Sequence, residues 1–225
     1  MSITQSILAR VDPKIRKALK NVYDECRILR HHKRGCHSAA SYAQTLQPLR
    51  IQFGCGPERK PGWLNTDIWP GPWATPDICL DVSRPLPFAS DSVEEIYSEH
   101  MFEHLDYPGS ARDFLSECFR VLKPGGRMTI GVPDLDAIYE EYRKRMTDNL
   151  CPSTVAPKFI LGHPLEELNY YFHQEGDHKF LYNEQFLSAL LTHFGFKNVL
   201  RRPFDSLMDS EHRREGTLYM VATKP

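Results

Sequence analysis

A short strand-like run, Leu49–Phe53, breaks directly into Gly54-Cys55-Gly56, and this junction constrains the fold more than any other feature. Apolar and β-branched residues favour a buried strand, whereas glycine adopts backbone angles closed to other residues. Glycine also has no side chain to hold a ligand away from the backbone. The junction therefore predicts a strand and a tight turn that can approach a bound molecule, although Gly-X-Gly also occurs in ordinary turns.

Strand-like and helix-like segments alternate through residues 49–225. Strands are predicted at residues 49–53, 63–68, 77–82, 93–98, 127–132 and 217–222, with a further segment at 197–199. Apolar residues recur at helical spacing in residues 108–122 and 183–194. This alternation is typical of an α/β fold with a doubly wound, mostly parallel sheet, in which ligands bind at the carboxyl ends of strands.

The composition limits the class of protein. The 225 residues are 41% hydrophobic and 25% charged, with a formal net charge of −1, which fits one domain with appendages. No apolar run reaches the ~18 residues of a membrane span, and the first residues lack an apolar signal-peptide segment. The six cysteines are scattered without a framework spacing, so we expect reduced thiols in a cytoplasmic protein.

Charge is distributed unevenly along the chain. Residues 1–50 carry ten Lys/Arg and three Asp/Glu, a balance of +7, and the remainder has a balance of −8. Asp12-Pro13 predicts a helix start with Asp12 as the N-cap. An apolar stripe then repeats at helical spacing: Ile15, Leu19, Val22, Cys26 and Leu29.

Residues 1–48 are therefore expected to form a basic helical arm, with residues 38–48 as a linker to the domain. The stripe would pack on the domain or on a second copy of the chain, which makes a homodimer contact one expectation. The alternatives are an anionic membrane surface and nucleic acid, although no aromatic residues interleave with the charges. The cysteines and histidines between Cys26 and His37 match no common zinc spacing, so we expect no metal there.

Several motifs follow one another in order after the linker. They are Phe53-Gly54-Cys55-Gly56, Pro-Gly-Trp-Leu-Asn-Thr-Asp (61–67), Leu-Pro-Phe-Ala-Ser-Asp-Ser-Val-Glu-Glu-Ile-Tyr (86–97), Glu-His-Met-Phe-Glu-His-Leu (99–105) and Arg-Val-Leu-Lys-Pro-Gly-Gly-Arg (120–127). Together they resemble the Rossmann-like, class I S-adenosylmethionine-dependent methyltransferases, and within them a predicted branch that acts on small molecules or is associated with glycans. The resemblance is dense over residues 49–135, looser over 178–223 and absent from 1–48.

The resemblance implies a seven-stranded Rossmann-like sheet in a domain of residues 49–225, with residues 135–180 inserted after the fifth strand as a lid over the acceptor. It also implies S-adenosylmethionine as cofactor. The turn would pass under the methionine moiety, Asp67 would accept the ribose hydroxyls, and the strand-four end would lie beneath the sulfonium. The cofactor-binding residues that it implies are Phe53, Gly54, Cys55, Gly56, Asp67, Ile68, Asp81, Val82, Ser98 and Glu99, with Asp81 and Val82 reading the adenine.

The cofactor assignment has alternatives in the residues themselves. Only ten residues separate Gly56 from Asp67, where about twenty is typical of dinucleotide folds, so the first helix is expected to be short or missing. Either Asp67 or Asp81 could instead cap a turn. NAD is the rival cofactor, but the third glycine of its fingerprint would fall at Arg59.

Methyl transfer to an oxygen is an in-line displacement that benefits from a general base. The candidates are His100, Glu103 and His104 after the fourth strand, Asp134 after the fifth, and the group His173, His178 and Tyr182. His178 is the first choice as base, followed by Asp134 and His104. Three tryptophans lie close together in the sequence: Trp63, Trp69 and Trp73. They would either line the acceptor site or pack within their loop. The sequence shows no compact cluster of carboxylates, so we expect no Mg²⁺-dependent transfer and no catalytic metal.

The sequence thus predicts methyl transfer from S-adenosylmethionine to a small-molecule or sugar acceptor, most simply at oxygen. A non-catalytic S-adenosylmethionine-binding partner protein is the alternative, motivated by the basic arm. Aminopropyl transfer is disfavoured because residues 98–99 offer a single acid. Nucleic acid is not expected as a substrate, since phosphate contacts need cations and the core balance is −8.

Overall fold

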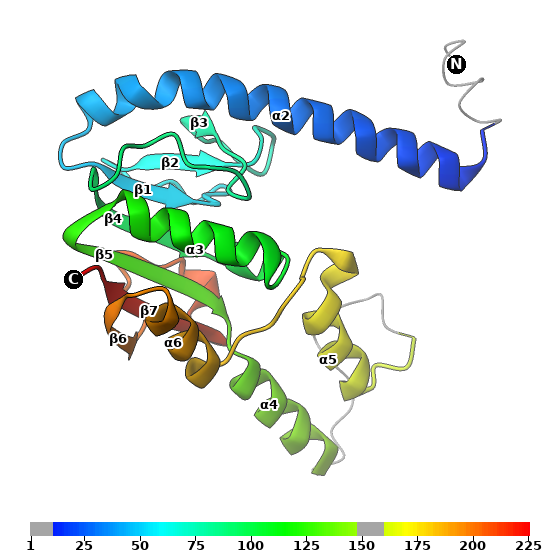
Figure 1. The fold of residues 1–225 in the computed structure, drawn as a ribbon. Coiled ribbons are helices and arrows are strands. Elements are labelled where there is room, and N and C mark those ends of the chain that lie inside the picture. The colour runs from blue at the N-terminus through cyan, green and yellow to red at the C-terminus, as the bar shows by residue number, and fades with distance from the viewer. Residues whose placement is uncertain (1–10, 148–159) are drawn as a thin grey trace.

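A single mixed sheet of seven strands organises the chain, in the order β3-β2-β1-β4-β5-β7-β6 (Figure 1). The computed structural model describes residues 11–147 and 160–225. The strands are β1 (Arg50–Phe53), β2 (Leu64–Asp67), β3 (Ile78–Cys79), β4 (Val93–Glu99), β5 (Leu122–Pro133), β6 (Lys197–Arg202) and β7 (Thr217–Thr223). Pairs from β3 to β5 are parallel, and β7 runs antiparallel to both β5 and β6. The predicted seven-stranded, mostly parallel α/β sheet is confirmed.

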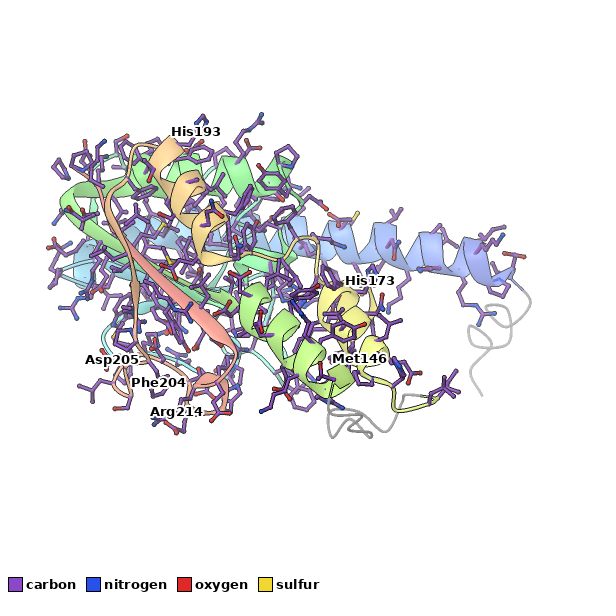
Figure 2. All side chains as sticks on the ribbon, turned by 90° about the horizontal axis from the view of Figure 1, so that it is seen from below. Met146, His173, His193, Phe204, Asp205 and Arg214 are labelled. Carbon is purple, nitrogen blue, oxygen red and sulfur yellow. The ribbon has the colours of Figure 1, made fainter. Side chains whose placement is uncertain are left out.

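The helices that follow β4 are η1 (Phe102–His104), α3 (Gly109–Val121), α4 (Leu135–Thr147), α5 (Pro164–His173), η2 (Gln174–Gly176), α6 (Glu184–His193) and η3 (Glu211–Arg213). Among them, helices α3 and α6 lie where the apolar period predicts them, at residues 108–122 and 183–194. α3 buries Phe114 and Leu115, and α6 buries Leu187 and Leu191 against the same core. In Figure 2, α6 and the loop that carries Phe204, Asp205 and Arg214 lie on opposite sides of the C-terminal strands.

The N-terminal helix α2 (Pro13–Thr45) begins where predicted, because the Asp12 carboxylate accepts the Lys14 backbone N–H at 2.8 Å. It continues to Thr45, however, so the prediction of an irregular linker at residues 38–48 is wrong over most of that range. The helix contacts the domain through His32, Gly35 and Ala39, all buried. A Cβ at Gly35 would overlap the carbonyl oxygen of Cys79, so α2 crosses β3 at backbone distance.

The first half of α2 extends past the edge of the sheet (Figure 1). Ile15, Leu19 and Val22 are 55–62% exposed, so the predicted apolar stripe does not pack on the described part of the domain. The packing surface is made instead by small residues farther along the helix, which carry no strong hydrophobic period. None of the helices within residues 11–147 and 160–225 has the length and apolar character needed to cross a membrane.

The connection from β1 to β2 contains turns and no helix, as the short spacing and its two prolines predict. After β5, α4 and α5 form a helical pair that stands away from the sheet (Figure 1). This pair is the described part of the insertion predicted at residues 135–180, and residues 148–159 lie outside the described residues. The carboxyl ends of β1, β2 and β4 are thus followed by a turn, a loop and η1, which carry most of the predicted site residues.

Candidate functional site

The glycine turn and Asp67 are brought together at the ends of β1 and β2. Gly54 and Gly56 have φ angles of +68° and +49°, which other residues rarely adopt. The Gly56 N–H donates to Asp67 Oδ2 at 2.9 Å, and the Ile68 N–H donates to Oδ1 at 2.8 Å. Asp67 therefore ties the turn to the end of β2 and places its carboxylate at the rim of a backbone cradle.

Met101 closes one side of this cradle. A Cβ built on Gly54 would lie 2.6 Å from Cβ and Cγ of Met101, whereas one on Gly56 would lie 3.7 Å from the Trp73 carbonyl oxygen. Gly54 is therefore required both by its backbone angle and by the approach of the segment after β4. Gly56 is required by its backbone angle alone.

Phe53 and Cys55 contribute to the cradle through their backbones. Phe53 is fully buried and packs edge-on against Phe114 of α3, with ring centroids 5.3 Å apart. The Cys55 N–H donates to the Thr66 carbonyl oxygen at 2.9 Å. Burial raises the pKa of the Cys55 thiol to about 12, so it is a neutral packing group.

The Asp81 carboxylate caps the turn after β3. Its Oδ1 accepts from the Ser83 N–H at 3.0 Å and the Ser83 hydroxyl at 2.6 Å, and its Oδ2 accepts from Arg84 Nε at 2.7 Å. The Asp81 N–H donates to Nδ1 of His32 on α2, at 3.1 Å. This is the turn-capping arrangement that the sequence left open, and half-buried Val82 follows it with its backbone at the same edge.

Ser98 and Glu99 point to opposite sides of β4, since successive strand residues alternate. Glu99 is buried, and its carboxylate accepts from the Ser210 hydroxyl and the Tyr219 hydroxyl, both at 2.6 Å. Its backbone carbonyl accepts from Arg213 Nη1 at 2.9 Å. The carboxylate therefore anchors the loop before β7, and the place of Glu99 beneath a sulfonium stays a prediction.

Tyr219→Phe should lower the free energy of unfolding by about 1.5–3 kcal/mol, because it removes a donor to a buried carboxylate. Denaturant unfolding measures this loss, with Tyr23→Phe on the exposed surface of α2 as the matched control. A loss no larger than that of the control would show that the Glu99 network contributes nothing to stability.

The Asp134 carboxylate is also held by contacts within the fold. Its Oδ2 accepts from Arg201 Nη2 at 2.8 Å, and its Oδ1 accepts the Asp136 N–H at 3.2 Å at the start of α4. The side chain is 4% exposed. Both carboxylate oxygens of Asp134 thus already have partners within the fold, so the geometry does not favour Asp134 as the base.

The three predicted tryptophans do not form one wall. Trp63 is buried and packs edge-on against Tyr97, with centroids 6.4 Å apart. Trp69 lies under the guanidinium of Arg27 on α2, 5.1 Å from its ring centroid. Trp73 is 82% exposed. Trp63 therefore packs in the core, and the other two lie along the loop after β2.

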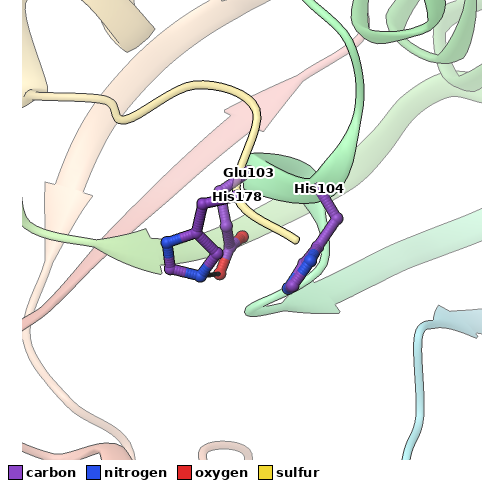
Figure 3. Close-up of side chains that lie close together, drawn as sticks. All are labelled: Glu103, His104 and His178. Carbon is purple, nitrogen blue, oxygen red and sulfur yellow. Dashed lines mark ion pairs between the residues drawn. The ribbon is translucent and has the colours of Figure 1, made fainter. Parts of the chain in front are cut away.

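His104 and His178, by contrast, are brought together around Glu103 (Figure 3). The two imidazole ring centroids are 5.1 Å apart, and His178 Nε2 lies 3.9 Å from Glu103 Oε1. The Lys179 N–H donates to the Glu103 carbonyl oxygen at 2.8 Å, which holds the segment before α6 against η1. Residues that are distant in sequence thus form one cluster beside Met101.

Burial dominates the electrostatics of this cluster. It raises the pKa of Glu103, which is fully buried, to about 8. Burial, with Arg213 as the next cause, lowers the pKa of His100 to about 3. Burial and the neighbouring His178 lower the pKa of His104. The histidines His100 and His104 are therefore neutral at pH 7, with lone pairs available.

A cavity of about 350 Å³ lies between α4 and α5, next to the residues before β7. Tyr142 and Tyr171 line it together with the ion pair Arg145–Glu167. The Tyr171 carbonyl oxygen accepts from His178 Nδ1 at 2.6 Å, so one wall of the cavity is bonded directly to the cluster. Sequence reasoning did not identify Tyr171 or Met101, because neither stands in a motif and only the fold places them at the site.

One family model matches part of the chain. Residues 52–130 match the family model described as "Methyltransferase domain", a range that includes the glycine turn, Asp67, Asp81 and η1. No curated protein matches the sequence.

Solved structures of similar fold include several methyltransferases. A SAM dependent methyltransferase from Archaeoglobus fulgidus has a TM-score of 0.50 at 16% identity, covering 84% of this chain and 92% of that chain. A SAM-dependent methyltransferase from Methanosarcina mazei has a TM-score of 0.46 at 16% identity, covering 80% and 95%. Phosphoethanolamine N-methyltransferase 2 from Haemonchus contortus, in complex with S-adenosyl-L-methionine, has a TM-score of 0.45 at 11% identity, covering 84% and 52%. At these identities the similarity extends to the fold alone.

Proposed function

The chain carries an S-adenosylmethionine-dependent methyltransferase domain, and from this premise we propose that it methylates a hydroxyl oxygen of a small-molecule or sugar acceptor. S-adenosylmethionine is the methyl donor. The choice of acceptor rests on the cavity between α4 and α5. Tyr171, which lines this cavity, is hydrogen-bonded through its carbonyl oxygen to His178 of the cluster.

The cradle fits the cofactor. The glycine turn offers backbone without side chains, and Asp67 stands at the end of β2 where it can exchange its backbone partner, Gly56 N–H, for ribose hydroxyls. We place the adenine beside Asp81 and Val82 and the sulfonium near Ser98, whose buried hydroxyl has no hydrogen-bond partner among the described residues. Bound there, the cofactor supplies an electrophilic methyl group.

The cavity favours a polar acceptor with a flat face. Tyr142 and Tyr171 offer rings on which a sugar or phenol can stack, and the Arg145–Glu167 pair offers donors and acceptors to hydroxyl groups. The opposed charges of that pair disfavour a polyanion. A polynucleotide would also meet a core with a balance of −8.

We assign to His178 the role of taking the proton from the acceptor hydroxyl. A carbonyl oxygen can only accept, so the bond to Tyr171 fixes the hydrogen on Nδ1 and leaves the Nε2 lone pair free. As the hydroxyl oxygen bonds to the methyl carbon, the carbon–sulfur bond breaks and leaves S-adenosylhomocysteine, and the hydroxyl proton passes to Nε2. His104 and Glu103 stand next to that nitrogen as its positioning residues.

The test is a calorimetric titration of the full chain with S-adenosylmethionine, S-adenosylhomocysteine and NAD, followed by an acceptor screen read as S-adenosylhomocysteine release. We expect binding of the first two ligands alone, and turnover on sugars or phenols that falls in Tyr142→Ala. Turnover confined to amines or nucleic acid would overturn the proposed acceptor class. Binding without turnover on any acceptor would favour a partner protein on the same fold.

Asp67→Ala should weaken S-adenosylmethionine by about 1.5–3 kcal/mol, the value of hydrogen bonds to a charged group. Because Asp67 also holds the Gly56 N–H, Asp67→Asn is the matched variant: its amide oxygen can keep that bond while the charge is lost. The asparagine NH2 group then faces the Ile68 N–H, so we expect Asp67→Asn to lower the unfolding midpoint less than Asp67→Ala does and still to lose affinity in the calorimeter. Unchanged affinity in both variants would remove Asp67 from the cofactor site.

The other expectations from the sequence stay predictions. A contact of the free half of α2 with a second copy or a membrane surface agrees with its exposed apolar residues. A cytoplasmic location agrees with the free thiols of the five described cysteines.

A further inference from the structure

Three side chains with metal-binding atoms meet beside the cradle: Glu103, His104 and His178. One candidate ligand atom from each lies within 4.8 Å of the other two. Figure 3 shows the Glu103 carboxylate between the two imidazole rings. The residues come from η1 and from the segment before α6, two segments that backbone hydrogen bonds hold together.

The Glu103 carboxylate is buried without a hydrogen-bond partner among the described residues. The residue is fully buried, and both carboxylate oxygens lack such a partner. The nearest basic atoms are His100 Nδ1 at 3.5 Å and His178 Nε2 at 3.9 Å, both measured to Oε1 and both beyond hydrogen-bond length. A buried carboxylate is costly when unpaired, so this one points to a positive group that completes the site.

His104 and His178 are held in the orientation that metal-binding histidines have in proteins. His178 Nδ1 lies 2.6 Å from the Tyr171 carbonyl oxygen, and His104 Nδ1 lies 3.2 Å from that of Asp177. Each carbonyl requires a hydrogen on Nδ1, so Nε2 is the nitrogen of each ring that can coordinate an ion. Metal-bound histidines donate their other nitrogen to a carbonyl or carboxylate in this way, which fixes tautomer and ring orientation.

We propose that Glu103, His104 and His178 bind a divalent zinc-class ion, with one coordination position left open. Two imidazoles and one carboxylate are a ligand set of catalytic zinc sites, whereas Mg²⁺ prefers oxygen ligands. Around a tetrahedral zinc the ligand atoms are about 3.3 Å apart, so the ligand atoms, now within 4.8 Å of one another, must approach by up to about 1.5 Å. His104 is half-exposed and gives the ion access from solvent.

The open position gives the ion a role at the acceptor, and this role rests on the proposed function. The Tyr171 carbonyl oxygen is bonded to His178 Nδ1, and on this proposal an acceptor bound in the cavity extends past Tyr171 to bring its hydroxyl to the ion. A bound ion lowers the pKa of a coordinated hydroxyl and stabilises the developing alkoxide. His178 would then be a ligand that positions the ion, and the proton would leave to solvent.

The test uses the full chain carrying Cys26→Ser, freed of metal by chelator and dialysis. Zinc is titrated by calorimetry, and cobalt(II) by its visible d–d absorption. We expect one ion per chain and a four-coordinate cobalt spectrum. Glu103→Gln preserves shape and should lower the affinity on the order of 100-fold, since even outer-shell changes cost 10–100-fold. His178→Asn should do the same, and the exposed His193→Ala is the matched control.

Two outcomes would overturn the metal site: no stoichiometric binding, or equal binding by wild type and Glu103→Gln, which marks surface adsorption. S-adenosylhomocysteine affinity is measured in the same preparations. If metal binding fails while S-adenosylhomocysteine still binds, the metal site alone is wrong. If metal binds and the cofactor product does not, the proposed function fails independently.

Discussion

Gly54→Val will lower the affinity for S-adenosylmethionine by at least about 100-fold, a loss of ~2.7 kcal/mol or more. At a φ of +68° any L side chain is strained by ~1–2 kcal/mol, and a β-branched one by more. The new side chain must also displace Met101, whose Cβ and Cγ lie 2.6 Å from the Cβ position. Both effects act where the backbone is expected to meet the cofactor, and calorimetry measures the loss.

Gly62→Val is the matched control for Gly54→Val. Gly62 lies in the same β1–β2 connection with a φ of +77°, but nothing lies within 4 Å of its Cβ position. Both variants carry the backbone strain, and Gly54→Val must also displace Met101, so both unfolding midpoints should fall and that of Gly54→Val should fall further. Only Gly54→Val should lose the cofactor. Equal and modest losses of affinity in the two variants would refute the cradle.

The parts of the fold that the sequence predicted are those whose signals are local. The glycine turn, α3 and α6 can each be predicted from a window of about fifteen residues, because the window contains a backbone requirement or an apolar period. α2 was predicted to end too early because its packing surface uses Gly35 and Ala39, small residues that produce no such period. Its more apolar first half, read as the packing face, is exposed.

The sequence predicted the part of the candidate site that the backbone forms. It did not predict the contacts between side chains that are far apart in the sequence. Asp67 lies eleven residues from Gly56, and their hydrogen bond follows from adjacent parallel strands. Glu99 looked like a site carboxylate, but its partners Ser210 and Tyr219 are 111 and 120 residues away. No local pattern predicts such pairings, and the same holds for Glu103 and His178.

His178→Asn should leave S-adenosylmethionine affinity intact and lower turnover by about 10²–10⁴-fold, the usual contribution of a positioned base. The asparagine amide can still donate to the Tyr171 carbonyl oxygen, so the segment before α6 keeps its anchor. The Nε2 lone pair is lost. Turnover is read as S-adenosylhomocysteine release with the acceptor that the screen identifies, and the exposed His173→Ala at the end of α5 is the control.

Chelation separates the two chemical roles that Nε2 can have. If His178 is the general base, removing metal leaves wild-type turnover unchanged, and only His178→Asn is slow. If His178 holds an ion, chelated wild type falls to the level of His178→Asn, and added zinc restores the wild type alone. Equal losses of cofactor affinity and turnover in His178→Asn would contradict both roles, because they would mean that the residue only supports the fold between η1 and α6.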